Sequence, residues 1–95
     1  THTGSSAASD VYKRQLSQSM ARELGPQGIH VAHFIIDGAI DTPFIKENFP
    51  DTYALKEKDG ILQPKEIAEA YWNIHVQHPS AWTQEMDLRP YMEKF

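Results

Sequence analysis

Asp37, Gly38 and Thr42 are the residues whose types and spacing could do chemistry at one place in this chain. They follow an apolar run in residues 28–43, GIHVAHFIIDGAIDTP, which ends abruptly at Asp37. A carboxylate accepts hydrogen bonds, a glycine without a Cβ lets the backbone approach a ligand closely, and a threonine hydroxyl both donates and accepts. We therefore expect residues 37–42 to bind a ligand. For Asp37, the alternative is a turn or cap residue after a strand.

Histidines elsewhere lack the spacing of a metal site. His30 and His33 are three apart in an expected strand, so they face opposite sides and cannot share a metal. His75 and His78 could meet at a helix end, but no helix-spaced carboxylate completes a set of three ligands. There is no Cys and no GxSxG serine elbow. We expect no metal site, and we assign no catalytic residue.

The apolar run must position the loop. Its β-branched and aromatic residues, bounded by glycines, predict a strand: Ile29, Val31, Phe34, Ile35 and Ile36. Near-continuous apolarity indicates cover on both faces, which is typical of a parallel α/β sheet. Open α/β sheets bind ligands at the carboxyl ends of their strands. Residues 37–42 follow this end.

A helix is predicted over residues 10–24. Its apolar residues recur every four positions and form a face toward the core: Tyr12, Leu16, Met20 and Leu24. Ser9 or Asp10 can cap it, and Gly25 with the proline after it can end it. Residues 1–9, THTGSSAAS, bury too little surface to offset the entropy of ordering, so we expect a disordered leader.

Further elements are predicted after the loop. A short helix begins at Pro43, is capped by Asp41 or Thr42 and ends at Pro50, and residues 51–63 contain one irregular helical turn. A second long helix spans residues 64–76, with its proline in the first turn. Residues 81–88 alternate in the period of a strand, which would be the last of the sheet.

The order of these features resembles the carboxyl-terminal third of the short-chain dehydrogenase/reductase family. The resemblance covers about residues 16–90 and rests on RELGPQGIHV, the apolar strand, DGAIDTP, and the helix opening QPKEIAEAYW. It implies an α/β fold, the carboxyl-terminal portion of a Rossmann-like doubly wound parallel sheet (helix, strand, lid, helix, strand), in one domain over residues 10–95. It also implies a full-length parent that transfers a hydride between NAD or NADP and an alcohol or carbonyl substrate.

The family's Pro-Gly-x-x-x-Thr loop touches the nicotinamide. Gly38 and Thr42 match its glycine and threonine, whereas Asp37 stands where the family has proline. One extra residue between Val31 and Gly38 indicates a bulge or a longer strand end. The resemblance thus implies four cofactor-binding residues, with backbone N–H groups near Ile40 on the carboxamide: Asp37, Gly38, Ile40 and Thr42.

Two further roles follow from the resemblance. Residues 43–63 correspond to a substrate lid, with Phe44, Ile45 and Phe49 lining the pocket; simple packing onto the core is the alternative. The family's last helix and strand pack against their copies, which predicts a homo-oligomer. The apolar residues available for such an interface are Ile67, Tyr71, Trp72, Ile74, Trp82 and Met86.

The family's catalytic Tyr-x-x-x-Lys is absent. Counting back from Leu16 places its two residues at Ser6 and Asp10. Tyr12 does not restore the motif, because Leu16 stands four residues on, and it is interpreted as a helix-face aromatic. Residues 3–10 also lack the second and third glycines of the family's phosphate loop. We expect this chain alone to be inactive.

Residues 10–15, DVYKRQ, resemble no part of the family but match the translation of a transposon adaptor used in sequencing libraries. The family pattern begins directly after them. We therefore expect that residues 1–15 are not native and that the parent protein continues upstream with the missing cofactor domain.

Composition limits the remaining possibilities. A net charge of −4 and scattered basic residues argue against a nucleic-acid surface. No apolar run approaches the roughly 20 residues of a membrane span, and no signal peptide is recognised, so we expect a cytoplasmic protein without a membrane partner. The alternative to a dehydrogenase fragment is a small αβ interaction module without catalysis. Neither the substrate nor the choice between NAD and NADP follows from these residues.

Overall fold

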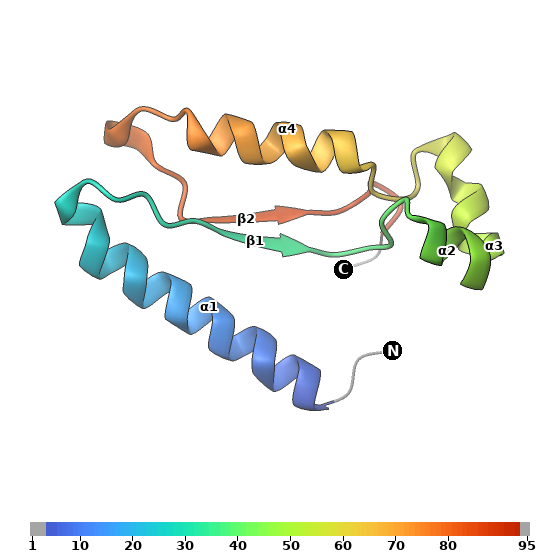
Figure 1. Ribbon diagram of the computed structural model, residues 1–95, viewed down its shortest axis with the longest axis horizontal. Helices are drawn as coiled ribbons and strands as arrows, with labels where there is room; N and C mark the ends of the chain where they lie inside the picture. The colour runs from blue at the N-terminus through green and yellow to red at the C-terminus, as the bar shows by residue number, and fades with distance from the viewer. Residues whose placement is uncertain (1–3, 94–95) are drawn as a thin grey trace. The chain divides into compact units, whose positions relative to one another are not determined.

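The computed structural model describes residues 4–93. Its helices and strands follow one another as drawn in Figure 1: α1 (Gly4–Leu24), β1 (His33–Ile36), α2 (Pro43–Asn48), α3 (Pro50–Tyr53), α4 (Pro64–His75) and β2 (Glu85–Leu88). Short 3₁₀ helices lie between them: η1 (Gly25–Gln27), η2 (Ala54–Lys58) and η3 (Pro79–Ala81). The chain divides into two compact units. The first runs to His33 and includes Gln77–Met86, and the second comprises Phe34–Val76 and the chain from Asp87 onward.

Strands β1 and β2 pair in parallel, and each unit contains one end of the pair. In the first unit the His33 N–H donates to the Gln84 carbonyl at 2.8 Å, and in the second the Asp37 N–H donates to the Leu88 carbonyl at 2.9 Å. Both partners advance by four residues in the same direction, which is parallel register. The expected α/β class with a parallel sheet is confirmed at this level. Each strand is shorter than expected: residue 81 belongs to η3, residues 82–84 have no regular structure, and β2 begins at Glu85.

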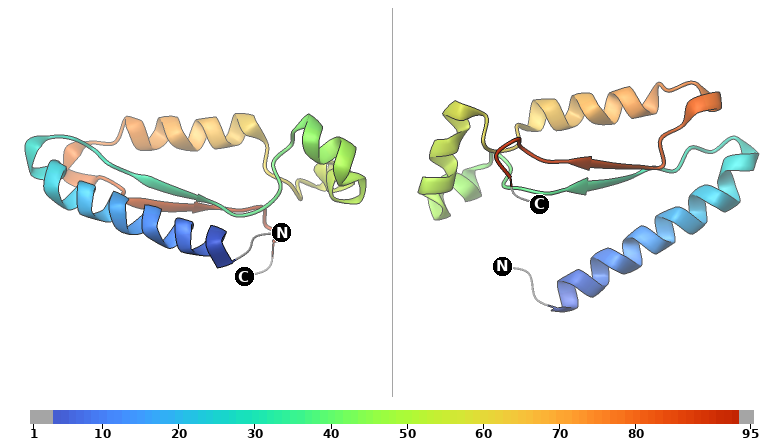
Figure 2. Two further views of the ribbon diagram at one scale, coloured as in Figure 1. Left: turned by 60° about the horizontal axis from the view of Figure 1, so that its bottom comes forward. Right: turned by 180° about the vertical axis from the view of Figure 1, so that it is seen from behind.

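In the first unit, α1 runs into η1 at Gly25, where the helix was expected to end (Figure 2). Gly28 closes this turn with φ 84°, and its N–H donates to the Gly25 carbonyl. The helix begins at Gly4, which corrects the expectation of a disordered leader for residues 4–9 and of a cap at Ser9 or Asp10. Alanine favours a helix and serine disfavours it only slightly, so the helix extends toward the N-terminus through these residues. Residues 1–3 lie outside the described part of the chain.

The apolar face of α1 is exposed. Tyr12, Leu16 and Met20 are 67%, 48% and 40% exposed. The expectation that this face lies in a core is therefore not met. Among the described residues of the first unit, 25–33 and 77–86 accompany the helix, and they leave this face uncovered. Its link to β2 is polar, an ion pair between Arg14 and Glu85 at 2.7 Å.

In the second unit, the chain after β1 forms successive short helices. The Thr42 side chain accepts a hydrogen bond from the Ile45 N–H at 3.3 Å and caps α2, as expected. Pro50 ends α2 by starting α3, because a proline fits the first turn of a helix. Residues 51–58 are thus helical throughout, more than the single turn expected, and Asp59 ends them with φ 57°.

Helix α4 matches the expected helix closely, with Pro64 in its first turn and its end at His75. Its Tyr71 ring stacks on Phe34 of β1, with ring centroids 3.8 Å apart. Ile74 and Ile61 are the buried hydrophobic residues of the described chain, at 4% and 3% exposure. The small core of the second unit therefore lies between α4, β1 and the segment before α4.

Candidate cofactor loop

Residues 37–42 leave the carboxyl end of β1, and Asp37 opens them with an ion pair. Its carboxylate lies 3.0 Å from the Arg89 guanidinium, which also contacts Asp87 at 2.6 Å. Arg89 is only 17% exposed. The pKa of Arg89 is raised, chiefly by its hydrogen bond with Asp87. The negative charges of Asp87, Asp37 and Glu93 raise this pKa further, whereas desolvation lowers it. Asp37 is thus a bridge between chain segments as well as a strand-end residue.

Gly38 has φ 138°, a backbone conformation that favours glycine. A Cβ built at this position would lie 2.8 Å from Cδ of Pro90 and 3.3 Å from its Cγ. The sequence predicted that the missing Cβ admits a ligand. In the structure the space on that side is filled by the proline ring, so the close approach at Gly38 is made by the chain itself.

Ile40 forms a parallel bridge with Leu62. The Leu62 N–H donates to the Ala39 carbonyl and the Asp41 N–H to the Leu62 carbonyl, each at 2.8 Å. These bonds use the groups on either side of Ile40. The bridge therefore fixes the direction of the peptide at Ile40, the place where the sequence predicted contact with a carboxamide.

Thr42 combines two functions. Its hydroxyl oxygen caps α2, which leaves the hydroxyl hydrogen able to donate to another acceptor. Thr42 also lines a groove of about 550 Å³ together with Asp41, Pro43, Lys46, Glu47 and Tyr53. This groove directly adjoins the loop, which places a hydrogen-bond donor beside a space that a ligand can enter.

The predicted lid residues lie on or beside α2. Phe44 and Phe49 are 59% and 51% exposed, and their ring centroids are 6.0 Å apart. Ile45 is half-buried and supplies the N–H that Thr42 caps. The two phenylalanines are therefore available on the surface and in contact with each other. This arrangement is compatible with either alternative left open by the sequence.

Lys56 and Tyr53 join the loop through side chains that the sequence analysis missed. The Lys56 ammonium lies 2.9 Å from Asp41 and donates to the Tyr53 hydroxyl at 3.3 Å. The hydrogen bond with Asp41 raises the pKa of Lys56 above its ordinary value of 10.5, with a further contribution from Tyr53. Lys46 lies 5.9 Å from the centre of the same ring. One wall of the groove is therefore cationic and aromatic.

Arg89 was also missed, although the sequence contains a signal for it. Asp87 and Arg89 are two residues apart at the end of a strand, and side chains with that spacing point to one side of the sheet. The neighbouring parallel strand, β1, ends at the same edge of the sheet and is followed by the loop. An arginine just after β2 can therefore reach the Asp37 carboxylate at the start of that loop.

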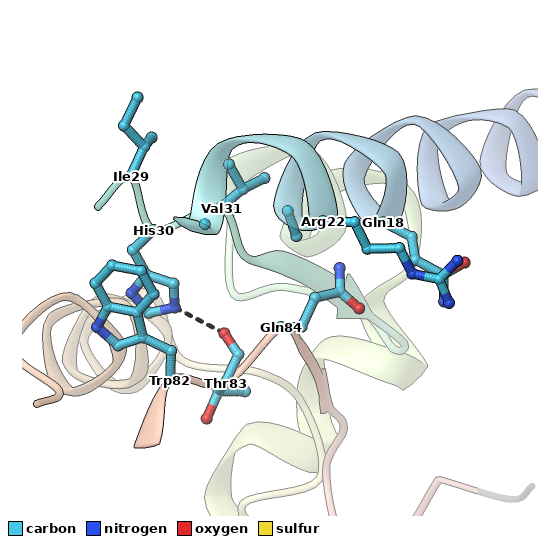
Figure 3. Close-up of a pocket in the computed structure, with 10 residues that line it drawn as sticks. Gln18, Arg22, Ile29, His30, Val31, Trp82, Thr83 and Gln84 are labelled. Carbon is cyan, nitrogen blue, oxygen red and sulfur yellow. Dashed lines mark hydrogen bonds between the residues drawn. The ribbon is translucent and has the colours of Figure 1, made fainter. Parts of the chain in front are cut away.

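A second groove, of about 290 Å³, lies in the first unit and is shown in Figure 3. The His30 ring stacks on Trp82 with centroids 4.5 Å apart, and its Nε2 lies 2.8 Å from the Thr83 carbonyl. Arg22 and Gln84 also line the groove. These residues precede the strands, whereas ligands of open α/β sheets bind beyond the carboxyl ends. We therefore assign the His30–Trp82 pair to packing. His33 lies instead near Glu85, at 3.8 Å.

Comparison with solved structures identifies a short-chain dehydrogenase from Rhodopseudomonas palustris. It shares 42% sequence identity with this chain and superposes with a TM-score of 0.52. The chain resembles part of a short-chain dehydrogenase. The match covers 82% of this chain and 26% of the dehydrogenase, so the chain spans about a quarter of that protein's length. A scan of family models and a search of curated proteins found no match.

These findings support the resemblance seen in the sequence and the interpretation of the chain as an oxidoreductase-derived segment. The parallel pair of strands is compatible with part of a Rossmann-like sheet. In residues 4–93 no helix combines the length and the apolar character that crossing a membrane requires. The origin of residues 1–15 stays a prediction.

Proposed function

We propose that this chain is the carboxyl-terminal part of an NAD(P)-dependent oxidoreductase that acts on an alcohol or carbonyl compound. One observation carries the proposal: residues 37–42 stand at the carboxyl end of a parallel strand in a chain 42% identical to a short-chain dehydrogenase. In this proposal Asp37, Gly38, Ile40 and Thr42 form the nicotinamide end of the cofactor site. NAD or NADP would supply the hydride acceptor or donor.

The residues present fit a nicotinamide carboxamide, which offers one acceptor oxygen and two N–H donors. The Ile40–Leu62 bridge orients the peptide groups at Ile40, and Thr42 retains a hydroxyl hydrogen to donate. These groups would hold the carboxamide. The adjoining groove, with Tyr53 and Lys46 on its wall, would receive the substrate, and Phe44, Ile45 and Phe49 would belong to the lid over it.

In this proposal the chain supplies only part of the active site. Hydride transfer needs a held cofactor and a positioned proton donor or acceptor. The Tyr-x-x-x-Lys pair and the phosphate loop of the family have no counterpart in residues 1–95. Both would come from upstream sequence in the parent protein.

The upstream nucleotide sequence is the most direct test. An in-frame continuation that encodes a glycine-rich loop and Tyr-x-x-x-Lys is the expected result. A start codon close to Thr1 would favour the non-catalytic interaction module instead. Titration of the full-length protein with NADH and NADPH, followed by nicotinamide fluorescence, then measures cofactor binding and identifies the preferred cofactor.

We also propose that the parent is a homo-oligomer that uses α4. Tyr71 and Trp72 on this helix are 48% and 59% exposed, and Val76, which caps its end, is 56% exposed. A large exposed apolar patch marks an interaction site, and a twofold axis would bury the same patch on both copies. The exposure of these residues supports the proposal, and light scattering tests it.

A further inference from the structure

Residues 89–93, here called the C-terminal strap, follow β2 and pack against the candidate cofactor loop. Arg89 binds Asp37 at the start of the loop. Pro90 is buried, and its ring fills the space beside Gly38. The Glu93 N–H donates to the Pro90 carbonyl at 3.0 Å, which turns the strap back on itself. All these residues belong to the second unit.

The strap also contacts the segment that pairs with the loop. A Cβ built on Gly60 would lie 2.8 Å from Sδ of Met92, just as one on Gly38 would lie 2.8 Å from Pro90. Gly60 is buried and stands two residues before Leu62, the bridge partner of Ile40. The strap therefore lies against both segments of the Ile40–Leu62 bridge. The contact at Gly38 is with the rigid Pro90 ring, whereas the contact at Gly60 is with the flexible end of the Met92 side chain.

Arg89 is the polar anchor of the strap. Its planar guanidinium joins Asp87 of β2 to Asp37 beyond the end of β1, so one side chain links the carboxyl ends of both strands. Arg89 itself is 17% exposed, whereas the Asp37 and Asp87 carboxylates are 45% and 41% exposed, so the two ion pairs are only partly shielded from water. Arginine suits this use because its donors form a rigid fork that can serve two carboxylates at once.

We propose that the C-terminal strap positions the candidate cofactor loop, and that Arg89 is a positioning residue acting on the loop through Asp37. This inference rests on the proposed function, which supplies NAD(P) as the ligand of the loop. By holding Asp37 and Gly38, the strap sets the direction of the peptide groups at Ile40 before the cofactor arrives. A site organised in advance loses less entropy on binding, which strengthens affinity.

Two matched substitutions test this role, Asp37→Asn and Asp87→Asn. Each preserves side-chain shape and removes one carboxylate from Arg89, but only Asp37→Asn cuts the link to the loop. The Arg89–Asp87 contact is the shorter, 2.6 Å against 3.0 Å. If Arg89 only stabilised the fold, Asp87→Asn would therefore disturb the loop as much as Asp37→Asn does, or more.

Hydrogen exchange on the 95-residue chain measures loop order directly. The Asp41 and Leu62 amides report on it, because both bonds of the Ile40–Leu62 bridge depend on them. We expect Asp37→Asn to speed their exchange about twofold to fivefold, as for loss of a partly exposed ion pair. Asp87→Asn should change them less. Equal exchange in the two variants, or no change in either, overturns the proposal.

A second probe covers the case in which Asp37→Asn fails to fold, as judged by circular dichroism. Arg89→Lys keeps the charge but loses the fork that joins two carboxylates. We expect it to speed exchange of the Asp41 and Leu62 amides while the amides of α4 keep their rates. Uniform acceleration across α4 and the loop overturns the positioning role.

Cofactor titration of the full-length protein separates this inference from the proposed function. With binding present, Arg89→Lys, which leaves Asp37 itself unchanged, should raise the NAD(P)H dissociation constant about twofold to fivefold more than Asp87→Asn does. Equal dissociation constants overturn the positioning role. Absence of binding by the unsubstituted protein contradicts the proposed function, whereas the exchange rates still decide whether the strap orders the loop.

Discussion

Gly38 lies against Pro90, so any side chain at position 38 meets the C-terminal strap. This contact affects the interpretation of substitutions there. Gly38→Val in a full-length protein should weaken cofactor binding if the loop holds the nicotinamide, but the valine would also displace Pro90. Unchanged cofactor affinity would contradict the assignment, whereas reduced affinity requires a control for the strap.

A double-mutant cycle with Pro90 supplies that control. We expect Gly38→Ala to lower the free energy of unfolding by about 1–3 kcal/mol, because alanine rarely adopts φ 138° and its Cβ would clash with Pro90. Pro90→Ala in the same chain should recover part of this loss by removing the ring. Strictly additive effects in chemical denaturation would show that the two residues do not interact.

Lys56 provides a prediction about pH. Because its pKa is raised above 10.5, its pairing with Asp41 stabilises the fold fully below pH 10.5 and is lost as the pH rises through the higher folded value. We expect Lys56→Met to lower the melting temperature by a constant amount between pH 7 and about pH 10. Above that range the difference from the unsubstituted chain should shrink.

Lys65→Met, on an exposed residue of α4, serves as the control for loss of charge. Thermal unfolding followed by circular dichroism measures all three chains. A difference between Lys56→Met and the unsubstituted chain that persists unchanged above pH 11 would contradict the ion-pair explanation.

At the scale of elements, the turn after α1 depends on one of two nearby glycines. Gly28 has φ 84°, whereas Gly25 is outside the positive-φ region, and a Cβ on either would meet nothing within 4 Å. Both positions therefore have room for a side chain, and they differ only in backbone conformation. We expect Gly28→Ala to destabilise the chain by about 1–2 kcal/mol.

Gly25→Ala is the matched control and should be neutral or stabilising by up to about 1 kcal/mol, since it reduces the entropy of the unfolded chain. The free energies of unfolding of both variants, from urea denaturation, test the pair. A cost at Gly25 as large as that at Gly28 would show that the left-handed turn is not the cause.

For the whole molecule, we expect the 95-residue chain to be catalytically inert. It carries the proposed nicotinamide loop without the family's phosphate loop and Tyr-Lys pair, so a cofactor would be held weakly and no proton would be delivered. Absorbance at 340 nm follows the oxidation of NADH or NADPH with a panel of ketones and aldehydes. Turnover above a no-protein control would refute this expectation.

We also expect the chain to associate. The described sheet has two strands, so each has an unpaired edge, and α4 exposes Tyr71 and Trp72. Trp72→Glu should reduce association, whereas Asn73→Glu, at the exposed next position of the same helix, should not. Size-exclusion chromatography with light scattering measures the mass. A monodisperse monomer of 10.8 kDa for the unsubstituted chain would favour the interaction module.

The sequence by itself determined the features that depend on neighbours in the chain. Thr42 caps α2, Pro64 starts α4 and Gly25 ends α1, because caps, prolines and glycines act on backbone groups within a few residues. The apolar run before Asp37 likewise placed the loop at a strand end. The start of α1 was missed because weakly polar residues carry little signal for either helix or disorder.

Only the tertiary structure decided what surrounds the loop. Arg89 meets Asp37 and Pro90 meets Gly38 across more than fifty residues of chain, and the parallel pairing of β1 with β2 brings them together. Parallel strands need a long crossover, so the register that unites their ends depends on everything folded between them. For that reason the local sequence pattern was enough to place the loop after β1, whereas its contacts with Arg89 and Pro90 depend on long-range packing.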